Sequence, residues 1–159
     1  MILTFSGIAP DIDGVGVLID MLAPLFGMST NLWVQYHHTL HTLFFAIVVA
    51  LMAAFFASKQ KLFVGFLAFV FFHIHLLCDL LGSKGPDGYL WPIPYFSPIS
   101  NDFLLIWSGQ WELNAWQNVV IACFLFLVTY RLIKIKKVSP FEIISEKMSQ
   151  TFLKLLKVW

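Results

Sequence analysis

The stretch LFVGFLAFVFFHIHLLCDLL, residues 62–81, decides the fold. It is almost wholly apolar and has the length of about 20 residues that a helix needs to cross a bilayer core. His73, His75 and Asp79 nevertheless lie inside it. Ionisable residues are costly in a membrane segment and by default mark a functional site. The stretch therefore predicts a membrane helix with a site on it.

The composition of the whole chain supports a membrane protein. Its 159 residues are 59% hydrophobic and 12% charged, with a mean hydropathy of +0.81, whereas about a quarter of a soluble domain is charged. The net charge of +1 argues against nucleic acid as the main partner. Cys78 and Cys123 stand in apolar runs. We predict that both are buried thiols, because two isolated cysteines form no disulfide framework or zinc spacing.

Three segments are predicted to span the membrane: residues 42–58, 62–81 and 116–133. The first is expected to start earlier, near Trp33. The apolar stretch 15–26 is shorter and contains Asp20 and Pro24, so it predicts a re-entrant or interfacial helix. The predicted fold is an all-α polytopic membrane protein.

Basic residues predict the orientation of these spans. None occurs before Lys59, while Lys59 and Lys61 flank the first turn and a cluster lies at and after the end of the third span: Arg131, Lys134, Lys136 and Lys137. The positive-inside rule places both groups in the cytoplasm. The N-terminus and the loop 82–117 are then outside, and the C-terminus is inside. That loop is rich in proline, which excludes a long helix, and most of its tryptophans are expected to form an aromatic belt.

The tail from Ser139 is predicted to be an amphipathic helix. Ser139 and Glu142 have the spacing of a capping box, with Pro140 at the first helical position. An apolar stripe follows, formed by Phe141, Ile144, Met148, Phe152, Leu155 and Trp159. With its lysines, the helix is expected to lie on an anionic leaflet; packing on another helix or a partner chain is the alternative. We therefore divide the chain into a membrane-embedded domain, 1–138, and a tail, 139–159.

Two pairs of polar residues are predicted to meet near the outer face. His37 and His41 are four residues apart, as are His75 and Asp79, so on helices each pair shares a face. His41 and Asp79 both lie 19 residues from Gln60, where the first two spans turn. At 1.5 Å per residue, both are roughly 28 Å from that turn. The two pairs are therefore expected at the same level.

Asp11 and Asp13 add two carboxylates on the same side. They lie between Pro10 and Gly14, which mark a turn, and in an extended segment both would point one way. Imidazole and carboxylate together suit zinc, iron or manganese. Six candidate ligands exceed the need of one tetrahedral ion, which favours a centre of two or three metals that acts on a phosphoester.

Each of these signals also has a structural explanation. An aspartate pair before glycine is often only a turn, and Asp79 could pair with a histidine across the hairpin. We interpret His73 as a core residue, and His38 as a surface group or a neighbour of the ligands. The agreement in level, side and ligand type is what favours a metal site.

Several motifs resemble the LexA-regulated inner-membrane metal-dependent hydrolases. They are Ala9-Pro10-Asp11-Ile12-Asp13, Tyr36-His37-His38-Thr39-Leu40-His41, His75-x-x-x-Asp79, the loop Gly85-Pro86-Asp87-Gly88-Tyr89, Trp91-Pro92-Ile93-Pro94-Tyr95 and Trp111-Glu112-Leu113-Asn114. The resemblance implies a bacterial inner-membrane protein. It also implies a metal site of Asp11, Asp13, His37, His41, His75 and Asp79.

The function that we expect is metal-dependent hydrolysis of a phosphoester, including a lipid headgroup, at the outer membrane face. Zinc is the expected ion, a small molecule or lipid is the expected substrate, and Asp87 or Glu112 would serve as general base or extra ligand. The alternative is a non-catalytic metal-binding or scaffold protein. Transport is disfavoured because residues 46–56 and 63–72 contain no polar side chain.

Overall fold

The computed structural model describes residues 2–32 and 37–156, and this part of the chain is helical with no β-strand. It forms two compact units, Met1–Leu113 and Asn114–Trp159. The first unit contains α1 (Ile2–Ile8), η1 (Pro10–Gly14), α2 (Val15–Leu22), η2 (Ala23–Phe26), α4 (Leu43–Phe56) and α5 (Lys61–Gly82). The second contains α6 (Trp116–Lys136), η3 (Pro140–Ile143) and α7 (Glu146–Leu155). The predicted all-α membrane class is confirmed.

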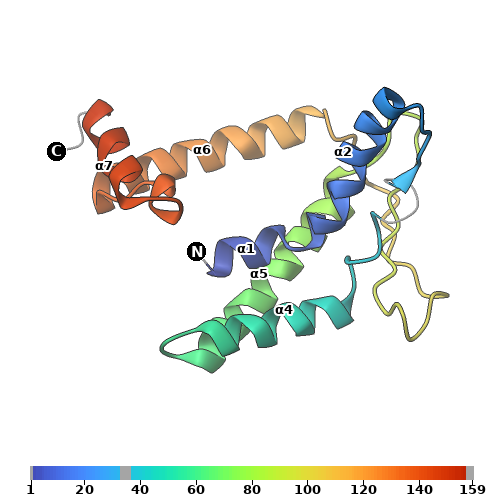
Figure 1. Ribbon diagram of the computed structural model, residues 1–159, viewed down its shortest axis with the longest axis horizontal. Coiled ribbons are helices and arrows are strands. Elements are labelled where there is room, and N and C mark those ends of the chain that lie inside the picture. The colour runs from blue at the N-terminus through green and yellow to red at the C-terminus, as the bar shows by residue number, and fades with distance from the viewer. Residues whose placement is uncertain (1, 33–36, 157–159) are drawn as a thin grey trace. The chain divides into compact units, whose positions relative to one another are not determined.

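Helices α4 and α5 form the central hairpin of the first unit, and α1 packs against α5 (Figure 1). Gln60 makes the turn between them with a left-handed backbone, at φ 50°. The helices approach closely near this turn, because Gly65 faces the backbone of Ala50 and the side chain of Ala54. At the other end a core of Ala9, Ala46, Phe72, Leu76 and Ile93 lies under the polar residues.

Two helices have the length and composition to cross a membrane, α5 and α6. The first predicted span is shorter than expected: α4 has 14 residues, or roughly 21 Å at 1.5 Å per residue. It begins at Leu43 because the Thr42 side chain accepts a hydrogen bond from the N–H of Phe45 at 3.1 Å. The expected start near Trp33 lies outside the described residues.

The N-terminal segment is bent rather than continuous. Helix α1 and the segment Pro10–Phe26 meet at 55°, as in a broken span or a re-entrant loop. This geometry agrees with the re-entrant or interfacial helix expected for 15–26. Helix α1 has only seven residues, too few for a periodic apolar pattern to predict it.

Three local predictions were wrong. Cys78 and Cys123 are free, as expected, but both are exposed because they lie on outward faces of α5 and α6. The tail is not one helix from Ser139: a 3₁₀ turn precedes α7, which begins after Ser145. Ser139 makes no capping bond, because its hydroxyl donates instead to Ser149 Oγ at 3.0 Å.

Candidate metal centre

The two aspartates of η1 reach the site from one short 3₁₀ turn. The segment is not extended, because Pro10 starts a helical turn between the residues that mark a turn in the sequence. The two side chains consequently differ in exposure, 55% for Asp11 and 5% for Asp13. They approach opposite sides of one imidazole: Asp11 Oδ1 lies 3.9 Å from His41 Nε2, and Asp13 Oδ2 lies 3.5 Å from His41 Nδ1. His41 thus stands between them.

His37 and His41 lie in the turn before α4, so the predicted helical face for this pair is wrong. Asp13 organises this turn. Its Oδ1 accepts a hydrogen bond from His37 Nδ1 at 2.9 Å, and its Oδ2 accepts one from the N–H of Leu40 at 3.0 Å. A carboxylate that satisfies backbone and side-chain donors replaces the helical bonds that the segment lacks. The turn, rather than a helix, aims His41 at α5.

His75 and Asp79 share a face of α5, as their spacing predicts. Asp79 Oδ2 lies 3.1 Å from His75 Nε2 and 3.3 Å from His41 Nε2. The latter contact crosses the hairpin and confirms the level predicted by counting from Gln60. Asp11 Oδ1 completes the group at 3.4 Å from His75 Nε2. All six predicted ligands therefore belong to one connected cluster.

The donor set of this cluster fits a divalent cation. Asp11, His41 and His75 each offer a ligand atom within 4.8 Å of the others. Three buried atoms make no hydrogen bond of good geometry: His41 Nδ1, His75 Nε2 and Asp79 Oδ2. Buried polar atoms in that state need a partner. Two imidazoles and two carboxylates provide the nitrogen and oxygen ligands of zinc and related metals.

The charge state of His41 is set by its carboxylate neighbours. Burial by itself would lower the pKa of His41, but the close carboxylates of Asp13 and Asp79, at 3.5 and 3.3 Å, outweigh it and raise the pKa to about 9. In the cluster without a metal, this imidazole carries a proton at neutral pH. A cation that binds Nε2 must displace that proton.

A cleft of about 440 Å³ opens beside the cluster. It is lined by Asp11, Gly14, His37, Asp79, Ser83, Trp91 and Leu113. The ring centroid of Trp91 lies 5.1 Å from that of His37 and 4.3 Å from that of His38. Buried Gln110 fixes it by accepting from the Trp91 N–H at 2.7 Å and donating to its carbonyl at 3.1 Å.

Sequence reasoning missed four cleft residues: Gly14, Ser83, Trp91 and Leu113. Trp91 belongs to a quoted motif, but its position depends on Gln110, 19 residues away. No periodic pattern reports such a loop contact. The tryptophan–proline pair in this motif was the only available signal.

The two predicted general bases differ in position. Asp87 is exposed in a turn that Gly88 closes through a hydrogen bond to the Gly85 carbonyl at 3.0 Å. Glu112 is also exposed, but its backbone pairs with Lys84, and its neighbour Leu113 lines the cleft. Glu112 is therefore next in the chain to a wall of the cleft.

The remaining two histidines have different surroundings. His73 Nδ1 donates to the Phe69 carbonyl at 2.8 Å, so its Nε2 accepts from the Tyr95 hydroxyl at 2.9 Å. Both ring nitrogens are satisfied, as predicted for a core histidine, although the residue is half-buried rather than fully buried. His38 stacks on Trp91 and lines a second cavity next to Thr39.

Comparison with known families identifies the family of the chain. Residues 1–139 match the model of the YdjM inner membrane protein family. The chain belongs to this family. The match supports the LexA-regulated inner-membrane family that the motifs resemble, and with the apolar helices it supports a membrane location. The YdjM description names neither a reaction nor a metal. No curated protein and no solved structure matches the chain.

Proposed function

We propose that this YdjM-family protein is a membrane-bound, metal-dependent hydrolase of a phosphoester at the outer membrane face, lipid headgroups included. The observation that carries the proposal is the meeting of Asp11, His41 and His75 from three separate segments, with ligand atoms within 4.8 Å. A ligand set assembled from distant parts of a chain is not explained by local turn geometry.

Asp11, His41, His75 and Asp79 would hold the ion, with zinc as the expected metal. Asp13 would orient His41 through its other ring nitrogen, in the way that carboxylates orient metal-bound histidines. His37 would hold Asp13 in place through their 2.9 Å contact. This arrangement divides the six predicted residues into four ligands and two supporting groups.

An open side favours catalysis over a structural metal, because structural sites are closed by protein ligands and catalytic ones keep a free position. The exposed Asp11 side chain and the adjoining cleft leave room for water and substrate. When bound, a divalent ion lowers the pKa of a coordinated water and polarises a phosphoryl oxygen. Of the two predicted bases, Glu112 has the better position to take a proton, and Trp91 and Leu113 offer apolar surface to a substrate.

Metal content and hydrolysis, measured together, test the proposal. Wild type, Asp79→Asn and His41→Gln are purified from membranes, and metal is counted by mass spectrometry. Both variants should insert but lose metal, and only wild type should hydrolyse phosphomonoester, phosphodiester or phospholipid substrates. Lys84→Gln, near the cleft but outside the cluster, is the control and should keep its metal.

A non-catalytic metal site is the second candidate. Its supporting observation is the 3.3 Å contact between His41 and Asp79 across the hairpin, because an ion bound there would also hold the two segments together. Wild type with full metal but no hydrolysis of any of the three substrate classes would favour it and reject the hydrolase.

A further inference from the structure

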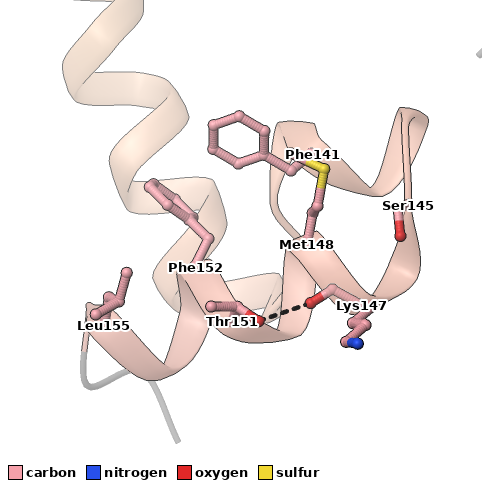
Figure 2. A pocket seen from close by; sticks show the side chains of 7 residues that line it. All are labelled: Phe141, Ser145, Lys147, Met148, Thr151, Phe152 and Leu155. Carbon is pink, nitrogen blue, oxygen red and sulfur yellow. Dashed lines mark hydrogen bonds between the residues drawn. The ribbon is translucent and has the colours of Figure 1, made fainter.

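The segment after α6 presents an apolar stripe that its own fold leaves uncovered. Leu155 is 77% exposed and Met148 is 45% exposed. The ring of Phe141 packs on that of Phe152 with centroids 4.9 Å apart. Figure 2 shows these four side chains along one groove, of about 370 Å³, with Lys147 at its edge.

A different face of α7 is buried. Ser149 and Leu153 are 3% and 2% exposed, and Ser149 accepts the hydrogen bond from Ser139. At 3.6 residues per turn, Ser149 is rotated by roughly 100° from Met148. The contacts that hold α7 in its unit therefore leave the stripe free for another occupant.

Basic charge is concentrated in the same part of the chain. Residues 114–159 contain seven basic and two acidic residues, whereas residues 1–113 contain three basic and seven acidic ones. Lys147 and Lys154 are exposed and border the stripe on the side opposite to Ser149. Lysines in that position can lay their stems along apolar surface while their ammonium groups reach phosphate.

The tail also begins at the level of lipid headgroups. Helix α6 has 21 residues, or roughly 31 Å, close to the thickness of the hydrocarbon core. Lys134 and Lys136 lie in its last turn, and η3 starts only four residues after Lys136. The Ser139–Ser149 hydrogen bond ties α7 to a residue only three positions after the end of α6, so α7 stays near that end.

We propose that the stripe of α7 docks into a leaflet of anionic phospholipid, with Lys147 and Lys154 on the headgroup phosphates. Charge complementarity and the level of the tail favour lipid over a protein partner, since an amphipathic basic helix at this level meets lipid first. The segment from Pro140 onward lies beyond the residues that match the YdjM model. The lipid contact is therefore separate from the proposed hydrolase.

Depth measurements on the full chain test the proposal. A spin label is placed at Met148→Cys in a Cys78→Ala, Cys123→Ala background, and the protein is reconstituted in nanodiscs of phosphatidylcholine, with or without phosphatidylglycerol. With phosphatidylglycerol, the label should lose collisions with a water-soluble nickel chelate and gain collisions with oxygen. A label at Gln150→Cys, on the opposite side of α7, is the control and should remain accessible to nickel.

Charge reversal identifies the occupant. Lys147→Glu together with Lys154→Glu should return the Met148 label to water. A label that is accessible to nickel in both lipids would overturn the proposal. A label that is shielded from nickel in both lipids and in the charge-reversed variant would also overturn the proposal, because it indicates a protein contact. Leu155→Cys provides a second label on the stripe, so that a fault in one variant cannot decide the result.

Discussion

The two ends of the α4–α5 hairpin are held together by different physics. Near Gln60, the helices touch through small residues: a side-chain carbon added at Gly65 would lie 3.0 Å from both the Ala50 carbonyl and Ala54 Cβ. At the other end, His41 and Asp79 meet across the hairpin at 3.3 Å. One pair of helices thus combines an apolar contact with an ionic one.

The difference follows from the solvent that each end is expected to meet. In lipid, apolar side chains gain nothing by leaving an apolar medium, so helices associate where small residues allow close packing. Buried charges are stable only when paired or bound to a metal. The small-residue contact can therefore fix the hairpin by itself, while the polar end needs a cation to complete it.

Overpacking the apolar end is expected to have the largest effect on stability. Gly65→Leu would push its side chain against the backbone of Ala50 and should destabilise the protein by about 3 kcal/mol, the upper range for overpacked sites. The free energy of unfolding is measured by titrating detergent-solubilised protein with sodium dodecyl sulfate. Metal bound to the folded fraction should remain at the wild-type level, because the cluster lies at the other end.

Alanine at two helical glycines provides the matched control. Alanine at Gly65 meets two atoms at 3.0 Å, whereas at Gly7 its nearest contact is the Phe71 carbonyl at 4.0 Å. Alanine favours a helix over glycine by about 1 kcal/mol. Gly7→Ala should therefore be neutral or stabilising, whereas Gly65→Ala should be destabilising, though less so than Gly65→Leu. Equal stability of Gly65→Leu and wild type would show that the small-residue contact does not hold the hairpin.

At the polar end, Asp13→Asn is expected to weaken metal binding without removing a ligand. Asparagine keeps the shape but loses the charge that orients His41 and favours its binding to a cation. Loss of such supporting carboxylates costs about 10- to 100-fold in metal affinity. Competition with a fluorescent chelator measures this loss.

Asp20→Asn is the control for Asp13. Asp20 Oδ1 likewise accepts a side-chain and a backbone hydrogen bond, from Thr30 Oγ1 at 2.6 Å and the Leu32 N–H at 2.9 Å. It is outside the metal cluster, so its replacement should leave metal affinity unchanged. An equal loss in both variants would mean that the N-terminal segment merely loosens, and that Asp13 has no specific role.

The level of the site could be predicted from the sequence. In a helical hairpin, two residues that are equally far in sequence from the turn lie at the same height along the two helices. Counting from Gln60 placed His41 opposite Asp79 although His41 itself is not helical. The N-cap explains this. Thr42 starts α4 directly after His41, so His41 lies only two residues before the first helical residue, Leu43, and close to the height that helical counting gives. Helices α5 and α6 were predictable for a simpler reason, since each contains an apolar run long enough to cross a membrane.

The walls of the site could not be predicted, because they depend on contacts between segments without a regular period. Asp13 holds the turn at His37 and Leu40 through single hydrogen bonds across more than 20 residues. Gln110 fixes Trp91 in a similar way. A local sequence pattern predicts which face of a helix or strand a residue occupies. It does not predict which distant group will form a hydrogen bond with that residue. The capping box at Ser139 failed for this reason, as Ser149 competes for the same hydroxyl.

The smallest expected effect concerns the point between the two ends of the hairpin. His73 on α5 accepts a hydrogen bond from the Tyr95 hydroxyl, and the Tyr95 carbonyl accepts one from the N–H of Leu43 at the start of α4 at 2.8 Å. Tyr95→Phe removes only the first of these bonds. We expect a loss of about 1 kcal/mol in the free energy of unfolding, typical of one hydrogen bond. Tyr89→Phe, an exposed tyrosine of the same loop, should have no effect.

Metal affinity in Tyr95→Phe shows whether His73 supports the metal centre or only the packing of the hairpin. If the backbone bond from Leu43 is sufficient to place α4, the affinity should stay within a few-fold of wild type, because His41 keeps its carboxylate neighbours. A drop as large as that of Asp13→Asn would show that His73 belongs to the support of the metal centre. In that case the polar end would extend about half a turn deeper along α5 than the cluster itself, since His73 lies two residues before His75 on this helix.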